Sequence, residues 1–316
     1  ALTLYALVTA FADSGEPAIG RAATAMAEGL LKKARTGDRP AGAFNGFILK
    51  SLMSCVRVLD CGAALELARA TVRKVFEEDP TFSKDNTFSH GGHMHGNLRT
   101  LVGAADYALF TGEAALLARV DALYRWVRGT GTRFGFLPEV IGRAGDIVAC
   151  ETCALMDYAG LGVTLANHGH PEYWPDMERL ARNQYAESQL VDASWLRGDD
   201  ARPDTEQFTW REIGDRCLGA WAGWSSPTHF LACRETLDAH WGGPELRGKT
   251  RALQNCCGGS GVHGLFILWK NAARFEDGRL WVHLHVDKAL PEAEIRGGQP
   301  WRGDLAVILK KACDVR

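Results

Sequence analysis

The chain has 316 residues, 46% of them hydrophobic, and its formal net charge of −2 comes from basic and acidic residues scattered along it. This length allows a well-buried core in one large domain or two. Because the basic residues form no stripe and no apolar run is long enough to span a bilayer, we expect neither nucleic acid nor a membrane as a partner.

The first part of the chain is dominated by the periodicity of amphipathic helices. Residues 1–10 are apolar like the core of a signal peptide, but they lack a basic leader, and we predict that they form a first helix. Residues 17–36 have one apolar face and end in basic residues, which favour a helix C-terminus. No repeat of fixed period is present, which argues against a regular solenoid. Further helices are predicted for residues 44–60, 62–78, 97–110, 113–130, 151–168 and 171–189.

Residues 190–255 are rich in tryptophan, glycine and aspartate and show no clear periodicity. Long loops with several aromatic rings often wall a binding pocket, and the C–H faces of sugars stack on such rings. Each tryptophan taken alone could instead cover an edge of the core. The set as a whole favours a sugar-binding wall, with Trp224 as a candidate substrate-binding residue. The stretch contains Trp195, Trp210, Trp221, Trp224 and Trp241.

The pattern changes from helix to strand near Glu276. Residues 277–286 alternate apolar and polar side chains after an Asp-Gly turn signal, and residues 303–315 also fit a strand. We therefore predict a large helical domain in residues 1–275 and a β-strand segment of a C-terminal domain in residues 276–316. A β domain of about forty residues is too small to close its own sheet, so we expect this domain to be incomplete.

The chain contains nine cysteines, an odd number. A disulfide framework is typical of small secreted chains, so we expect most of these thiols to be reduced. Reduced thiols indicate cytoplasmic residence without excluding the periplasm. Five of the cysteines are interpreted as small buried apolar side chains: Cys55, Cys61, Cys217, Cys233 and Cys313.

The other notable cysteines lie in two short stretches with an acidic residue. Glu151 and Cys153 stand at the start of a predicted helix. Each has an ordinary alternative explanation: a carboxylate at this position complements the helix dipole, and a cysteine packs as an apolar residue. The adjacent Cys256 and Cys257 precede an apolar helical run, residues 262–269, whose N-terminus would lower a thiol pKa. They could instead form a strained vicinal disulfide. If the fold brings the two stretches together, three sulfurs and one oxygen suit tetrahedral Zn²⁺.

These motifs resemble those of the family 127 glycoside hydrolases, the β-L-arabinofuranosidase group. The resemblance is carried by Glu151-Thr152-Cys153, by Cys256-Cys257, and by the helix and strand that follow. His93 precedes a Gly-Ala-Ala triplet at the spacing seen in that family. The ordered blocks cover roughly residues 88–290. The resemblance implies an (α/α)6 barrel followed by the start of a β-sandwich domain, a carbohydrate substrate, and β modules that often mediate a homodimer.

The resemblance also implies roles for individual residues. Glu151, Cys153, Cys256 and Cys257 would hold zinc, and Cys256 would attack the anomeric carbon of a furanoside or an unusual sugar. Glu139, which precedes Glu151 in a loop, would be the acid/base, although a solvated loop carboxylate is its alternative interpretation. The family's Pro-Pro-Asn after the two cysteines is replaced here by Gly-Gly-Ser.

Histidines offer further candidates. His93 and His95 are predicted to bind sugar hydroxyls at the barrel mouth, with a separate metal site or no role as alternatives. His283 and His285 alternate on a predicted strand, so they share one face, which could bind a ligand or face solvent. Two other functions remain open. One is a helical-barrel sugar epimerase or lyase with structural cysteines, and the other is a non-catalytic carbohydrate-binding protein with a structural zinc.

Overall fold

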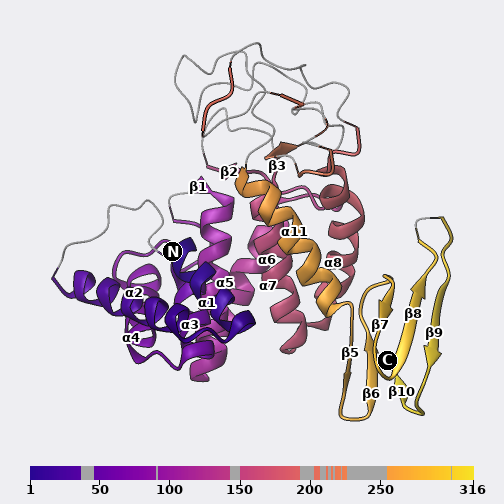
Figure 1. The fold of residues 1–316 in the computed structure, drawn as a ribbon, viewed down its shortest axis with the longest axis horizontal. Coiled ribbons are helices and arrows are strands. Elements are labelled where there is room, and N and C mark those ends of the chain that lie inside the picture. The colour runs from indigo at the N-terminus through magenta and orange to yellow at the C-terminus, as the bar shows by residue number, and fades with distance from the viewer. Residues whose placement is uncertain are drawn as a thin grey trace. The chain divides into compact units, whose positions relative to one another are not determined.

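The computed structural model describes residues 1–36, 46–89, 92–142, 150–192, 203–206, 211–212, 215, 218–221, 223–225, 255–299 and 301–316. The chain divides into two compact units, each of which is described by itself. Unit 1 comprises Ala1–Thr130 with Glu139–Ile147, and unit 2 comprises Gly131–Pro138 with Val148–Arg316. Figure 1 shows helices from the N-terminus onward and a group of strands at the C-terminal end.

The described helices are α1 Leu2–Ser14, α2 Pro17–Arg35, α3 Leu49–Leu59, α4 Gly62–Arg73, α5 Met94–Thr111, α6 Ala114–Thr130, α7 Thr152–Asn167, α8 Trp174–Leu180 and α11 Asn255–Asn271. The described strands are β1 Gly92–His93, β2 Val140–Ile141, β3 Cys150–Glu151, β4 Trp224–Ser225, β5 Ala273–Glu276, β6 Arg279–Val282, β7 Lys288–Ala289, β8 Ala293–Gly297, β9 Leu305–Leu309 and β10 Asp314–Val315. Among the described residues, no helix is both long and apolar enough to cross a membrane.

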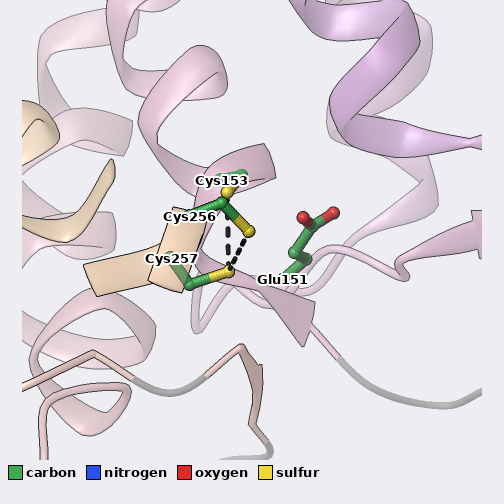
Figure 2. A group of neighbouring side chains, drawn as sticks. All are labelled: Glu151, Cys153, Cys256 and Cys257. Carbon is green, nitrogen blue, oxygen red and sulfur yellow. Dashed lines mark hydrogen bonds between the residues drawn. The ribbon is translucent and has the colours of Figure 1, made fainter. Parts of the chain in front are cut away.

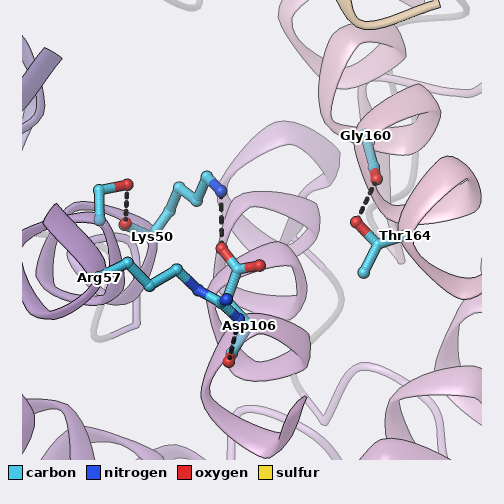
Figure 3. Close-up of polar contacts among 6 residues, drawn as sticks. Lys50, Arg57, Asp106, Gly160 and Thr164 are labelled. Carbon is cyan, nitrogen blue, oxygen red and sulfur yellow. Dashed lines mark hydrogen bonds and ion pairs between the residues drawn. The ribbon is translucent and has the colours of Figure 1, made fainter. Parts of the chain in front are cut away.

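Unit 1 is a set of packed helices in which α3 contacts α1, α4 and α5. The apolar face of α3 is buried in this core, as the helical periodicity predicted. A partly buried ion pair joins α3 to α5, with Lys50 Nζ 2.6 Å from Asp106 Oδ2 (Figure 3). Arg57 of α3 donates to the main-chain oxygen of Asp106 at 3.2 Å, so polar contacts fix how α3 lies along α5.

The close approach of α3 and α5 depends on Gly103. A Cβ atom at this position would lie 2.3 Å from Leu49 Cβ and 2.5 Å from the main-chain nitrogen of Lys50. We expect Gly103→Ala to lower the free energy of unfolding by about 1–3 kcal/mol, because backbone must move to admit the methyl group. Gly29→Ala in α2 is the control, since nothing lies within 4 Å of its new Cβ. The control should be neutral or stabilising by up to about 1 kcal/mol. Urea unfolding followed by circular dichroism compares the two, and equal effects would contradict this account of the packing.

Unit 2 is built around α7, which is buried along nearly its whole length and packs against α8 and α11. Within α7, the hydroxyl of Thr164 donates a hydrogen bond to the main-chain oxygen of Gly160 at 2.8 Å (Figure 3). After α11 the chain forms two small sheets. One has the order β10-β6-β5, with β10 parallel to β6, and the other is the antiparallel β7-β8-β9.

Lys288 of β7 connects the sheets to α11. Its buried ammonium group donates to the main-chain oxygens of Trp269 at 3.2 Å and Ala273 at 2.8 Å, beside the last turn of α11. A cation at a helix C-terminus satisfies carbonyls that lack intrahelical partners and complements the helix dipole. Lys288 of the strand segment therefore holds the C-terminal end of α11, the helix whose first turn contains Cys256 and Cys257.

The prediction of a mainly helical chain with strands at its C-terminal end is confirmed. The (α/α)6 barrel and the domain division at residue 275 stay predictions. The prediction that the helix starts at residue 262, after the two cysteines, is wrong, because α11 begins at Asn255 and contains both cysteines in its first turn. The strand predicted over residues 277–286 is shorter, because β6 ends at Val282.

His283, which follows β6, is part of an aromatic stack rather than an open sheet face. Its ring centroid lies 4.1 Å from that of Trp174, with 8° between the planes. Burial, together with the charges of Arg274 and Lys288, lowers the pKa of His283 from 6.5 to about 4. The folded chain therefore holds this imidazole neutral at pH values where the unfolded chain would protonate it.

This lowered pKa predicts a loss of stability in mild acid. As the pH falls from about 6.5 to about 4, the unfolded chain takes up a proton at His283 that the folded chain does not, so the free energy of unfolding decreases. We expect a decrease on the order of 1–2 kcal/mol, less than the full shift, because the ring is partly exposed. His283→Phe keeps the stack and removes the titration. Urea unfolding above and below this window should show a smaller pH effect in the variant, and an equal effect in both proteins would refute the assignment.

Candidate functional site

The first half of the site is formed where β3 leads into α7. Glu151 is the last residue of β3 and the N-cap of α7, with an extended backbone at φ −95° and ψ 127°. Cys153 lies in the first turn of α7. Both side chains are buried. The strand pairs antiparallel with β4, which fixes the direction in which the carboxylate leaves the backbone.

The second half of the site is the first turn of α11. Because α7 and α11 pack against each other, the first turn of α11 can bring Cys256 and Cys257 to Cys153. Cys257 Sγ lies 3.5 Å from Cys153 Sγ and 3.9 Å from Cys256 Sγ, and the carboxylate of Glu151 lies alongside (Figure 2). One ligand atom from each of these four residues lies within 4.8 Å of every other. The four residues are called the thiol cluster below.

The distances in the thiol cluster fit a metal ion better than a disulfide. All three cysteines are free thiols, and their separations greatly exceed the roughly 2.05 Å of an S–S bond. Tetrahedral zinc with Zn–S bonds of about 2.3 Å would hold two sulfurs about 3.8 Å apart. The two sulfur–sulfur distances of 3.5 and 3.9 Å lie close to that value. The donor set is therefore compatible with metal binding.

The electrostatics of the thiol cluster oppose its ionisation. The pKa of Cys153 is raised far above its usual value by hydrogen bonds with Cys256 and Cys257 and by burial. The hydrogen bond with Cys153 lowers the pKa of Cys257, but its hydrogen bond with Cys256, its burial and the charge of Glu151 raise it more. A divalent cation stabilises thiolates and displaces their protons, so these groups need such a partner to carry charge.

Tyr185, which packs against α11 beside the cluster, was not predicted from the sequence. Tyr185, which ends a π-helical segment after α8, donates from its hydroxyl to the main-chain oxygen of Gly261 at 2.5 Å. Burial raises the pKa of Tyr185 above its usual range, with the neighbouring Cys153 and Cys257 adding to the effect, so it stays a donor. The closely spaced glycines of α11 were the available signal, because glycines on one helix often mark a close packing partner.

The other candidate catalytic residues lie in unit 1. Glu139 directly precedes β2, which pairs with β1 so that Val140 faces His93. Met94 donates from its main-chain nitrogen to the main-chain oxygen of Glu139 at 2.7 Å. The Glu139 side chain is only 2% exposed, so the alternative of a solvated loop carboxylate is wrong. His93 Nε2 lies 3.9 Å from Glu139 Oε1, which places the predicted acid/base beside a predicted sugar-binding histidine.

The remaining predicted residues are described in part. The ring of His95 lies edge-on to His93, with 5.8 Å between centroids, and packs against Phe47. The backbone of Trp224 belongs to β4 and pairs with Glu151 of β3, whereas the structure does not describe the Trp224 side chain. Trp221 is buried against Tyr185. The predicted wall of tryptophans otherwise falls outside the described part of the chain, namely at Trp195, Trp210 and Trp241.

A scan of the chain against models of known protein families gives no match, and a comparison with curated proteins gives none either. Solved structures do match. A structure described as a glycoside hydrolase aligns with a TM-score of 0.66 and 14% identity, over 98% of this chain and 54% of its own. A GH127 β-L-arabinofuranosidase from Geobacillus stearothermophilus T6 aligns with a TM-score of 0.57 and 14% identity, over 98% of this chain and 52% of its own. Another GH127 β-arabinofuranosidase aligns with a TM-score of 0.54 and 15% identity, over 84% of this chain and 40% of its own.

These matches concern the fold. The fold of this chain resembles that of the GH127 glycoside hydrolases, in agreement with the resemblance of the sequence motifs. The chain spans about half the length of the solved structures that it matches. What those longer enzymes do is a property of those enzymes, and the activity of this chain is treated below as a proposal.

Proposed function

We propose that the chain is the catalytic part of a zinc-dependent retaining exo-glycosidase, acting on a furanoside or an unusual sugar through a cysteine thiolate. One observation carries the proposal: three thiols and one carboxylate converge from two segments that are far apart in the sequence. The similarity of the fold to GH127 enzymes supports the reaction class and makes a carbohydrate the proposed substrate. The (α/α)6 barrel, the homodimer and the cytoplasmic residence expected from the sequence stay predictions.

The thiol cluster would be the zinc site, with Glu151, Cys153, Cys256 and Cys257 as ligands. When bound, zinc supplies the positive charge that keeps thiol ligands deprotonated near neutral pH. The fit is supported by the donor set of three sulfurs and one oxygen and by the sulfur–sulfur distances of 3.5 and 3.9 Å.

Cys256 is the proposed nucleophile because it is the exposed thiol of the cluster, whereas Cys153 and Cys257 are buried. A sugar can reach only a sulfur that solvent can reach. The two buried cysteines would then serve to hold the ion and orient Cys256, while the exposed one forms and breaks the bond to carbon.

The reaction would proceed in two displacements. In the first, the sulfur lone pair of Cys256 bonds to the anomeric carbon as the bond to the leaving oxygen breaks, and Glu139 gives its proton to that oxygen. In the second, the Glu139 carboxylate takes a proton from water, whose oxygen bonds to the anomeric carbon. The carbon–sulfur bond breaks and returns its electron pair to Cys256. Two inversions at one carbon give net retention of configuration.

His93 and His95 would support both Glu139 and the substrate. A buried carboxyl group needs polar neighbours in both of its protonation states, and His93 Nε2, 3.9 Å from Glu139 Oε1, is such a neighbour. The two histidines are also the proposed ligands of sugar hydroxyls, and Trp224 is the proposed stacking surface.

An alternative function is favoured by the proximity of Glu139 and His93. A sugar epimerase or lyase would use Glu139 and His93 as its base and acid, and the thiol cluster would then be structural. A non-catalytic carbohydrate-binding protein with a structural zinc is the remaining alternative. The three differ in their products, because only the glycosidase releases a free sugar by adding water.

A panel of aryl furanosides and pyranosides tests the proposal on zinc-loaded chain, with the products followed by proton NMR. We expect hydrolysis of at least one furanoside, and the first sugar released should have the same anomeric configuration as the substrate. Inverted product, an unsaturated or epimerised product, or no reaction across the panel would overturn the proposed function.

A further inference from the structure

The amino-acid sequence of the first turns of α11 favours neither a stable helix nor side-chain packing. They contain Cys256 and Cys257, followed by glycines at positions 258, 259, 261 and 264. Glycine is the weakest helix former after proline, and it offers no side chain for packing. This part of α11 nevertheless supplies two of the four residues of the thiol cluster, so its position must be set by contacts from outside the helix.

Tyr185 provides such a contact. Its hydroxyl lies 2.5 Å from the main-chain oxygen of Gly261 and 3.1 Å from that of Ser260, within the turn that follows the two cysteines. The ring is buried. Trp221 fixes Tyr185 in turn, because its indole Nε1 donates to the main-chain oxygen of Tyr185 at 3.2 Å.

The glycines allow this approach. A Cβ on Gly264 would lie 2.3 Å from the Tyr185 hydroxyl, and a Cβ on Gly261 would lie 2.2 Å from the ring of Trp221. The same Cβ on Gly264 would lie 3.2 Å from the Cα of Met156, in the turn of α7 that follows Cys153. Tyr185, α11 and α7 therefore meet in one tightly packed contact next to the thiols.

We propose that Tyr185 is a positioning residue for the thiol cluster, whose hydroxyl holds the first turns of α11 so that Cys256 and Cys257 face Cys153. Its role as a support of zinc binding and of the nucleophile rests on the proposed function. Its effect on the position of α11 does not depend on the proposed function and can be measured on the metal-free chain. Removing the hydroxyl alone is the informative change, because Tyr185→Phe keeps the ring and its packing.

The first arm of the test measures metal affinity. We expect Tyr185→Phe to weaken zinc binding by about 10–100-fold in competition with a chromophoric chelator, the usual effect of losing an outer partner of a metal site. The thiolate charge-transfer band of the Co²⁺-loaded variant should also change. Tyr173→Phe is the control, because Tyr173 is a buried tyrosine of the same unit whose ring stacks on His170. Wild-type zinc affinity and spectrum in Tyr185→Phe would overturn the proposal.

The second arm uses the metal-free chain and separates this proposal from the function. Amide hydrogen exchange over residues 256–261 should be at least about 10-fold faster in Tyr185→Phe than in Tyr173→Phe, because the turn has lost its outside hydrogen bond. If the wild-type chain binds no zinc, the proposed function fails while this arm still decides the role of Tyr185. Unchanged exchange would refute that role. Should Tyr185→Phe not fold, Trp221→Phe, which removes the hydrogen bond to Tyr185, should speed the same exchange, and wild-type exchange in it would count equally against the proposal.

Discussion

Replacing Cys256 with serine is expected to lower kcat/KM for glycoside hydrolysis by about 10⁴-fold or more, the scale of loss when a covalent nucleophile is removed. Serine places a hydroxyl where the thiol stood, but a hydroxyl is far less acidic than a thiol and much less nucleophilic toward an anomeric carbon. The protein should keep its circular dichroism spectrum, because Cys256 is exposed and supports no core packing. Initial rates on the best substrate of the aryl glycoside panel give the measurement.

Cys55→Ser is the matched control for this variant. Cys55 is a free thiol buried in α3 of unit 1, outside the thiol cluster. Its replacement should alter stability more than turnover, since a hydroxyl then occupies an apolar core position. If Cys256→Ser hydrolyses a glycoside at the wild-type rate, the nucleophile is another group, and the reading of the exposed thiol is wrong.

Replacing Glu139 with glutamine should lower hydrolysis by about 10²–10⁴-fold, the usual contribution of a positioned general acid/base. Glutamine keeps the size and polarity of the buried side chain, so the pairing of β1 with β2 should survive. The loss should depend on the leaving group. Substrates with alkoxide leaving groups need the proton and should lose most, whereas a nitrophenyl glycoside should lose less in its first step.

This dependence on the leaving group separates a catalytic role of Glu139 from a structural one. Glu66→Gln is the control, because Glu66 forms an exposed ion pair with Arg35 at 2.6 Å. Such surface pairs contribute little, so this variant should hydrolyse every substrate normally. If Glu139→Gln lowers all rates by one common factor, the carboxylate supports the fold rather than proton transfer.

The sequence allowed the thiol cluster to be predicted because its chemistry is local to two short motifs. Glu151 and Cys153 are two positions apart at the junction of β3 with α7, and Cys256 is adjacent to Cys257. Each pair is therefore brought together by the chain itself, and only the packing of α7 on α11 had to be supplied by the fold. The resemblance of the motifs to a known family indicated that packing in advance.

The start of α11 could not be predicted from local propensity. The glycines at positions 258, 259 and 261 argue against helix, so the sequence placed the helix start after them. In the structure, the packing of Trp221 and Tyr185 against Gly261 and Gly264 outweighs this propensity. Tertiary contacts of this kind leave no periodic signal in the sequence, which is also why Tyr185 was missed.

Burial of Glu139 was not predictable for a related reason. It lies in a stretch that reads as a loop, and its burial depends on the two-residue pairing of β1 with β2, which is too short to give an alternating pattern. His283 gave an opposite error: it follows the end of β6 at Val282, so it does not share a strand face with His285, and its ring stacks on Trp174. In both cases the side chain is placed by a contact that is distant in the sequence.

The proposed function requires that Glu151, Cys153, Cys256 and Cys257 together hold one zinc ion. The most direct test is the metal content of the chain purified without chelator, measured by elemental analysis on wild type, on a Cys153→Ser, Cys257→Ser double variant, and on Cys55→Ser. We predict about one zinc per chain in the wild type and in Cys55→Ser, and none in the double variant. A wild-type chain free of metal after exposure to zinc, or a double variant that retains a full equivalent, would contradict the claim.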